Sequence, residues 1–177
     1  NHFQSRVRTI PNMSQISVLI LMGSDSDAPV MQAAVDVLRE LEISCEMTVA
    51  SAHRSPERVT RLVRGAPGRG VKVYIVGAGA AAHLAGVVAA HTTAPVIGVP
   101  IDSSALKGLD ALLSTVQMPP GVPVATVSIG KPGATNAGVL AAQILALGDP
   151  AIAGRLERYK TKLAEKVEQA AARLAGA

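Results

Sequence analysis

The chain has 177 residues, of which 49% are hydrophobic and 17% are charged, with 16 glycines and 11 prolines. This length suits one domain with a single hydrophobic core, so we expect a folded, soluble protein and exclude a disordered or fibrous one. The formal net charge is +4, but the chain has no Trp, two Tyr and one Phe. So few aromatic side chains offer almost nothing for bases to stack on, and we expect no nucleic-acid partner.

The lone cysteine, Cys45, excludes an internal disulfide and a metal site built from several cysteines, which favours a cytoplasmic protein. No apolar run approaches the roughly 20 residues of a membrane-spanning helix, so no membrane partner is expected. Residues 1–12 lack the apolar stretch of a secretion signal, and we interpret them as a tag or a disordered leader. Residues 13–177 are then expected to form a single α/β domain.

The first predicted strand covers residues 16–22, an uninterrupted apolar run typical of a central parallel strand buried on both faces. Ser26 or Asp27 can cap the helix that follows, and Pro29 suits its first turn. Apolar residues at helical spacing continue to about Glu42, where we expect this helix to end.

The alternation of strand and helix then continues along the chain. Residues 44–50 predict a second strand, and Ser55, Pro56 and Glu57 supply the cap, proline and acidic residue of a second helix start. The remaining predicted elements are a strand at 72–77, a helix at 82–91, a strand at 96–99, a helix at 105–117, a strand at 123–129 and a helix at 134–147.

This alternation predicts an α/β fold with three αβα layers and a doubly wound, five-stranded parallel sheet. One more helix is expected at 149–175, appended to the sheet. Its apolar residues step by three or four, with Lys, Arg and Glu between them. They are Ile152, Leu156, Tyr159, Leu163, Val167, Ala171 and Leu174. We expect this stripe to pack on a neighbouring subunit or on a groove of its own molecule, because it would otherwise expose an apolar surface.

Three polar or glycine-rich loops follow predicted strands, at the edge where open α/β sheets bind ligands. The first loop, residues 23–27 (GSDSD), combines serine hydroxyls and carboxylates with the free N–H groups of a helix start. Such a loop can bind a ribose or an anion. Its Ser and Asp residues can equally serve as ordinary helix caps.

The second loop, residues 51–56 (SAHRSP), places His53 beside Arg54. Imidazole both gives and takes a proton near neutral pH, and a guanidinium grips phosphate with two hydrogen bonds. The pair therefore suits proton transfer on an anionic substrate. Alternatively, His53 only hydrogen-bonds carbonyl groups of its own loop.

The third loop, residues 77–84 (GAGAAAHL), partly matches the dinucleotide-binding pattern GxGxxA. A dehydrogenase would need an acidic residue at the end of the next strand, and the only candidate, Asp102, falls in a loop. The small residues are better explained by close approach to a flat ligand, with His83 as a further donor. We interpret His91, deep in the predicted helix, as structural.

Several common catalytic motifs are missing from the chain. It contains no GxxxxGK[ST] phosphate loop, no GxSxG elbow, no HExxH and no CxxC. ATP hydrolysis, acyl-serine chemistry and zinc are therefore unsupported. We expect no cofactor and no metal.

Five strings occur in order near the expected strand ends: MGSDSD at 22–27, SAHRSP at 51–56, GAGAAAHLAG at 77–86, PVIGVP at 95–100 and LLSTVQMPPGVPVATVSIG at 112–130. Together they resemble the class I N5-carboxyaminoimidazole ribonucleotide mutases, over essentially Ser17–Gly148. The resemblance implies a cofactor-free purine biosynthesis enzyme, a homo-octamer of flavodoxin-like subunits. Such an enzyme moves a carboxylate from the exocyclic nitrogen of its ribonucleotide substrate to carbon 4 of the imidazole ring.

The resemblance also implies roles for individual residues. Ser24, Asp27 and Arg54 correspond to the residues that bind the ribotide, and His53 corresponds to the catalytic proton carrier. Further residues are implied to line the substrate site: Ser26, Ser51, Gly79, Ala80, Ala81 and Leu84. With the donor His83 of the third loop, they complete the expected substrate-binding set.

Arg54 also distinguishes two related activities, because the animal-type carboxylases that use free carbon dioxide place Lys after the corresponding His. The chain departs from the family pattern at Ala28 in place of Trp, at Ala85 and Val87 in place of Pro and Met, and at Ala125 in place of Gly. These departures concern packing near the site. A carbon-dioxide-dependent carboxylase and a non-catalytic ribotide-binding domain remain as alternative hypotheses.

Overall fold

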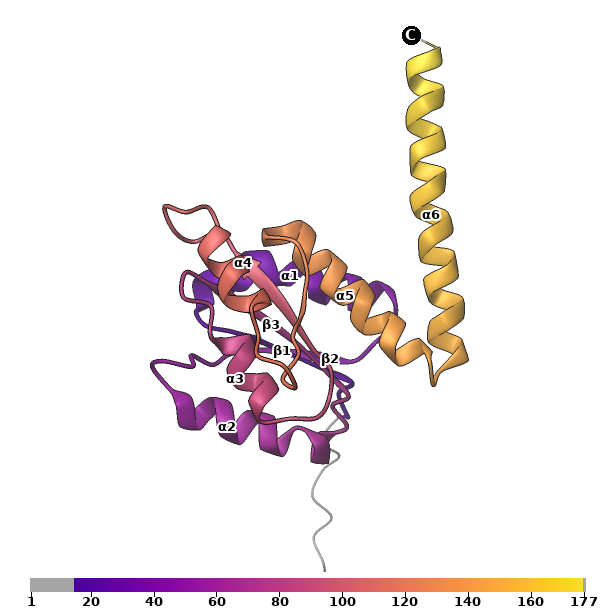
Figure 1. Ribbon diagram of the computed structural model, residues 1–177. Helices are drawn as coiled ribbons and strands as arrows, with labels where there is room; N and C mark the ends of the chain where they lie inside the picture. Colours follow the sequence, from indigo (N-terminus) through magenta and orange to yellow (C-terminus); the bar gives the residue numbers. More distant parts are fainter. Residues whose placement is uncertain (1–14, 177) are drawn as a thin grey trace, which may run out of the picture.

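A computed structural model describes residues 15–176 of the chain, so the expected leader at 1–12 lies outside the described residues. Five parallel strands form one sheet in the order β2-β1-β3-β4-β5 (Figure 1). The predicted doubly wound, flavodoxin-like fold is confirmed. The strands are β1 (Val18–Met22), β2 (Cys45–Val49), β3 (Val73–Gly79), β4 (Val96–Ile101) and β5 (Ala125–Thr126).

Helices cover both faces of this sheet. On one face lie α1 (Ala28–Glu40) and α5 (Gly130–Ala146), and on the other lie α2 (Pro56–Gly65), α3 (Leu84–Ala90) and α4 (Leu109–Val116). Two short 3₁₀ turns, η1 (Asp25–Asp27) and η2 (Pro67–Arg69), precede α1 and follow α2. The last helix, α6 (Pro150–Ala175), leaves the body and extends away from it (Figure 1). None of the helices between residues 15 and 176 is both long and apolar enough to cross a membrane.

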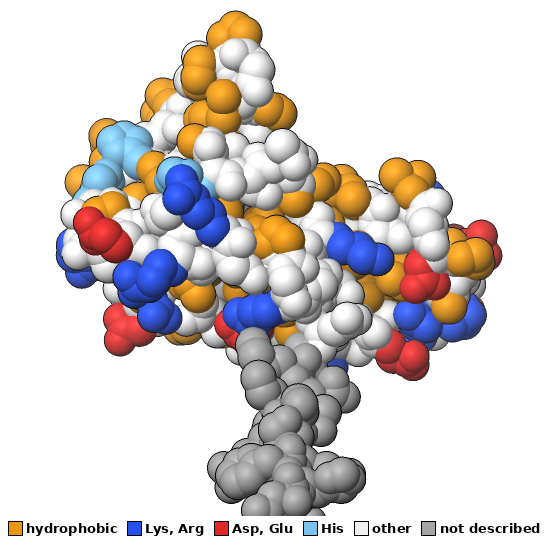
Figure 2. Space-filling model, turned by 90° about the horizontal axis from the view of Figure 1, so that it is seen from below, with side chains coloured by type: hydrophobic (Ala, Val, Ile, Leu, Met, Phe, Trp, Pro, Cys, Tyr) orange, Lys and Arg blue, Asp and Glu red, His pale blue; other side chains and the backbone are white. Residues whose placement is uncertain are grey.

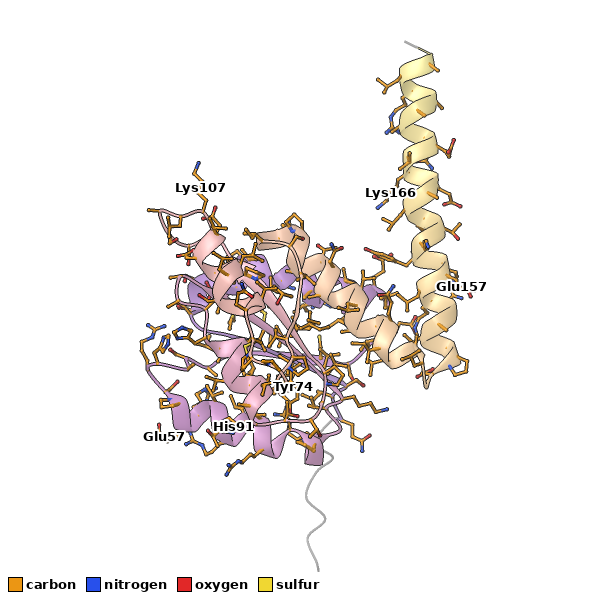
Figure 3. The ribbon with its side chains drawn as sticks, viewed as in Figure 1. Glu57, Tyr74, His91, Lys107, Glu157 and Lys166 are labelled. Atoms are coloured by element: carbon orange, nitrogen blue, oxygen red, sulfur yellow. The ribbon has the colours of Figure 1, made fainter. Side chains whose placement is uncertain are left out.

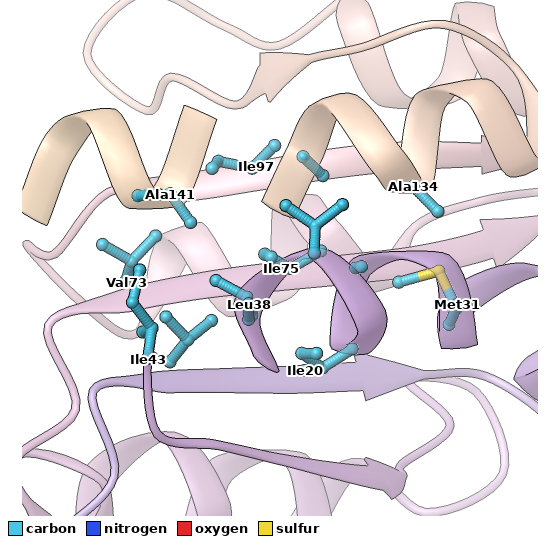
Figure 4. Packing of buried hydrophobic residues seen from close by; sticks show 14 of the residues in the cluster. Ile20, Met31, Leu38, Ile43, Val73, Ile75, Ile97, Ala134 and Ala141 are labelled. Carbon is cyan, nitrogen blue, oxygen red and sulfur yellow. The ribbon is translucent and has the colours of Figure 1, made fainter. Parts of the chain in front are cut away.

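Strand β1 is buried along its whole length, as its apolar run predicts. Its alternate side chains belong to two separate cores: Ile20 packs toward α1 and α5, whereas Leu21 packs toward α2 and α3. Figure 4 shows the first core, in which Leu38 of α1 lies close to Ile20 and Ile75 of the sheet. Burial of both faces is what allows the strands to be apolar at every position.

Several element boundaries differ from the prediction, most of them by one or two residues. The fifth strand, expected at 123–129, is only two residues long, because it forms an edge and pairs with β4 alone through Ala125 and Thr126. Helix α5 begins at Gly130, four residues earlier than expected. A Cβ at Gly133 would overlap the Ser128 carbonyl, so the absence of a side chain lets this first turn fold against the preceding loop.

Helix α6 is attached to the body only through its first part. Ile152 is buried, and the Arg155 Nε donates to the carbonyl of Leu41 at 2.6 Å. Lys162 Nζ donates to Glu40 at 3.1 Å. The expected packing of the stripe on a groove of its own molecule is therefore observed for this part. The part of the stripe beyond Leu163, which we call the distal stripe, consists of Val167, Ala171 and Leu174. It is exposed, and Leu174 has 81% of its surface exposed.

We expect two truncations of α6 to differ in stability. Ending the chain after Gly148 removes Ile152 and its partly buried neighbours Leu156 and Tyr159, which cover the first core, and should lower the free energy of unfolding by about 2–5 kcal/mol. Ending it after Leu163 removes only exposed turns and should change the stability by less than about 0.5 kcal/mol. Urea denaturation measures both.

The variant that ends after Leu163 also tests whether the distal stripe is a surface for self-association. We expect the chain ended after Leu163 to self-associate less than the full chain, because it lacks the exposed Val167 and Leu174. Light scattering measures the difference. An unchanged mass for this variant would show that the distal stripe is not an association surface.

Candidate functional site

The predicted loops meet at the carboxyl edge of the sheet, around the point where the strand order reverses between β1 and β3. There they enclose a cavity of about 290 Å³. Four strands contribute to it, because a loop after β4 joins the three loops expected from the sequence. The lining residues are Gly23, Ser24, Ser26, Asp27, Ser51, Ala52, His53, Arg54, Ala78, Gly79, Ala81, Leu84 and Ser103.

The first loop folds as a capping box around η1. The Ser24 Oγ accepts from the backbone N–H of Ser26 at 3.3 Å, and the Asp27 carboxylate accepts from the backbone N–H of Ser24 at 3.2 Å. Asp27 is the N-cap residue of α1, one of the two positions predicted, but its side chain makes no capping hydrogen bond to that helix. Asp27 precedes α1 but turns its carboxylate back to Ser24, because the 3₁₀ turn places that N–H within reach.

Asp27 is buried, with 6% of its surface exposed. Burial raises the pKa of this carboxyl above its ordinary value, since loss of water disfavours the charged form. The hydrogen bond from Ser24 and the positive charge of Arg54 both lower the pKa, but burial outweighs them. Keeping the buried carboxylate ionised therefore costs free energy of folding. A hydroxyl that donates a hydrogen bond to it would reduce that cost.

Arg54 joins the second loop to the first. Its Nη2 donates to the carbonyl of Gly23 at 2.8 Å, although 31 residues separate the two along the chain. Its backbone N–H donates to the Ser51 Oγ at 3.2 Å, and the Ser55 N–H donates to the Ser51 carbonyl at 2.9 Å. The guanidinium is therefore oriented over the first loop by contacts within the chain.

His53 is paired with His83, the residue that precedes α3. The His53 Nε2 and the His83 Nδ1 lie 2.7 Å apart, and the two rings are nearly perpendicular, at 85°. A hydrogen bond between two ring nitrogens needs one N–H and one lone pair. While this bond is present, the two rings cannot both be imidazolium. Figure 2 shows histidine side chains at the surface beside basic ones.

The third loop shapes the cavity mainly through residues that have no side chain or a small one. A Cβ at Gly79 would overlap the hydroxyl of Ser103, so the glycine lets the loop after β4 lie against the cavity. Ala80 has a left-handed backbone, with φ of 51°, which turns the chain at the end of β3. Ala81 and Leu84 line the cavity, whereas the side chains of Ala80 and His83 are not among its walls.

Ser103 is the polar wall residue that none of the predicted loops contains. Its position depends on β4 lying next to β3, and the order of strands in a sheet is not readable from a single sequence. The available signal was the polar pair that follows β4, at Asp102 and Ser103. By contrast, His91 ends α3 on the side away from these loops (Figure 3), with its Nε2 3.5 Å from the Thr60 hydroxyl, in keeping with a structural role.

The described part of the chain contains no group of three or more His, Cys, Asp or Glu side chains arranged to hold a metal ion. The cavity instead offers hydroxyls, one buried carboxylate, one guanidinium and the imidazole of His53, which is paired with His83. This set can bind a polar anion and exchange a proton with it.

Comparison with known proteins adds an independent finding. The chain matches the family model described as AIR carboxylase over residues 17–166. A protein of Pyrococcus abyssi named N5-carboxyaminoimidazole ribonucleotide mutase is 58% identical over 141 residues, which cover 80% of each chain. Proteins of the same name are 52% identical in Thermotoga maritima, over 88% of this chain and 90% of that one, and 54% identical in Bacillus subtilis, over 84% and 91%.

A solved structure agrees with these relatives. The crystal structure of Treponema denticola PurE superposes with a TM-score of 0.80 at 30% identity. The match covers 89% of this chain and 97% of that one. The likeness therefore extends over most of the sheet and its helices.

The raised pKa of Asp27 predicts the effect of removing its charge. Asp27→Asn should raise the melting temperature at pH 7 by about 1–4 °C, because the variant avoids ionising a buried group while its oxygen can still accept from Ser24. In the wild-type protein, the free-energy cost of ionising Asp27 is fully present above the pKa that this carboxyl has in the folded state. The cost is absent below the pKa that it has in the unfolded state, and this sets the sign of the effect.

The gain should therefore shrink as pH falls toward about 4, as measured by thermal unfolding at both pH values. Asp25→Asn, which changes an exposed neighbour in the same loop, is the matched control and should shift the melting temperature less. A less stable Asp27→Asn protein at pH 7 would contradict the assignment.

Proposed function

The chain belongs to the AIR carboxylase family, and from this membership we infer that it is an N5-carboxyaminoimidazole ribonucleotide mutase, an isomerase of purine biosynthesis. The observation that carries this conclusion is the high identity to curated mutases over most of both chains. The reaction removes the carboxylate from the exocyclic nitrogen of the substrate and attaches it to carbon 4 of the imidazole ring. We propose that it proceeds without ATP or a metal.

The proton balance of this reaction needs only one acid–base group. Breaking the N–C bond of the carbamate releases carbon dioxide and leaves a nitrogen that gains a proton. The ring carbon then attacks carbon dioxide, and the new C–C bond is kept when carbon 4 loses its proton. We propose that His53 gives the first proton and takes the second, so the enzyme returns to its starting state.

The pairing of His53 with His83 supports this role. The two rings share a single hydrogen between the His53 Nε2 and the His83 Nδ1, so the tautomers of the two rings are coupled: when one of these nitrogens donates, the other accepts. His83 can then take or return a proton as His53 changes state. In this proposal His83 contacts the proton carrier, His53, in addition to the substrate.

We propose that Ser24, Asp27 and Arg54 bind the ribotide, with the guanidinium on the phosphate and the carboxylate on ribose hydroxyls. Their support is that all three line one cavity although they come from two strand ends. The other proposed substrate-site residues are Ser26, Ser51, Gly79, Ala80, Ala81, His83 and Leu84. Enclosure of released carbon dioxide beside the ring would give it a high effective concentration.

We further propose a cytoplasmic homo-octamer, with residues 13–177 as one catalytic domain. Two exposed apolar stripes support association. One is the distal part of α6, and the other runs along α4 and the loop before it, through Leu106, Leu109, Leu113 and Val116. Surfaces of this kind are usually covered by another subunit.

The decisive experiment is turnover by the purified full chain. We expect synthetic N5-carboxyaminoimidazole ribonucleotide to be converted to the 4-carboxy product, followed by absorbance, without added bicarbonate or ATP. Turnover of aminoimidazole ribonucleotide only with bicarbonate would instead identify a carbon-dioxide-dependent carboxylase. Tight ribotide binding without turnover would identify a binding domain.

Replacing the proton carrier tests the mechanism. His53→Asn keeps a similar shape and some hydrogen bonding but cannot titrate, so turnover should fall by at least about 100-fold. Ribotide affinity should change by only about 1 kcal/mol, the value of one neutral hydrogen bond. Near wild-type turnover combined with much weaker binding would show that His53 is not the proton carrier, and His83 would be the next candidate.

A further inference from the structure

The loop that presents His53 and Arg54 leaves the sheet from an edge strand. Among the residues that the structure describes, strand β2 pairs only with β1, and its other side has no neighbouring strand. The backbone N–H of Ala50 donates inward, to the carbonyl of Met22 at 2.8 Å. Since the C=O and N–H of one trans peptide group point in opposite directions, the carbonyl of Val49 faces the free edge.

Arg58, in α2, supplies the missing partner on that edge. Its Nε donates to the carbonyl of Val49 at 2.8 Å. Its Nη2 donates to the hydroxyl of Thr48 at 3.0 Å. One side chain thereby joins the last two residues of β2 to the helix on the far side of the loop.

This bridge closes the loop from the outside, while Arg54 braces it from the inside through the Gly23 carbonyl. Within the loop, the Ser51 and Ser55 backbones are bonded at 2.9 Å. His53 lies between the two braces, and its side-chain partner in the described structure is His83. The place of the imidazole therefore depends on how the two ends of the loop are held.

We propose that Arg58 is a positioning residue for His53, which acts by fixing the β2 end to α2 and does not touch the substrate. This inference rests on the proposed function, since it assumes that His53 moves the proton. A planar guanidinium suits the task because its fork reaches two acceptors at once, whereas an ammonium group is a compact point charge. A misplacement of about 1 Å in such a group can cost about 100-fold in rate.

The experiment compares turnover by the full chain, four single variants and one double variant. Arg58→Ala should lower kcat by about 10-fold or more with little change in KM, because binding groups stay in place while the acid–base group shifts. Arg58→Lys should recover part of the loss. Arg61→Ala, which removes an exposed arginine from the same helix, is the control and should behave as wild type.

Thr48→Val tests the partner side of the bridge and does not require the Arg58→Ala protein to fold. It removes the hydroxyl acceptor and should lower kcat in the wild-type background. In the Arg58→Ala background it should add no further loss, because the two residues act through one contact. A silent Thr48→Val, or fully additive losses, would overturn the proposal.

The separate effects on kcat and on KM distinguish a positioning role of Arg58 from a direct interaction with the ligand. If Arg58→Ala raises KM and leaves kcat unchanged, the guanidinium acts on the charge of the ligand and the proposal is wrong. A second readout is independent of turnover: the imidazole proton resonances of His53 should shift in Arg58→Ala and not in Arg61→Ala. If the wild-type chain shows no turnover, the proposed function fails, and the resonances alone decide whether Arg58 positions His53.

Discussion

Strand β1 pairs on both edges and is buried on both faces, and the geometry of the candidate site depends on this placement. The chain moves outward from β1 to β2 and then returns to β3 on the other side. This reversal separates the helices that follow β1 and β3, so their loops leave an opening between them. His53 comes from one side of the opening and His83 from the other, which explains how residues 30 positions apart share a hydrogen bond.

Much of this arrangement was predictable because the sequence patterns have local physical causes. The apolar run at β1 requires burial on both faces, and Pro56 after Ser55 marks the start of α2 whatever surrounds it. The short β5 was not predictable, because its length depends on pairing with β4 alone. The first helix begins directly after Asp27, one of its two predicted caps. The 3₁₀ turn before it was not predictable, because Ser, Asp, Ser and Asp in succession offer several caps and only the three-dimensional turn selects Ser24.

For the site, the sequence located three loops but not their contacts. Nothing in the motifs indicates that Arg54 reaches Gly23 or that His53 meets His83. Both contacts cross between strands, so they depend on sheet order and on the direction of each loop. They also tie the loops together through contacts within the chain, which reduces the conformational entropy that binding must overcome.

The close packing of Gly79 against Ser103 links two positions that lie on different strand ends. A side chain at position 79 would need the space that the Ser103 hydroxyl fills. Neither position can therefore drift independently over evolutionary time, since enlarging residue 79 first creates an overlap and shrinking residue 103 first leaves a gap. Relatives that carry a side chain at the position of Gly79 should accordingly have a smaller residue, or a displaced loop, at the position of Ser103.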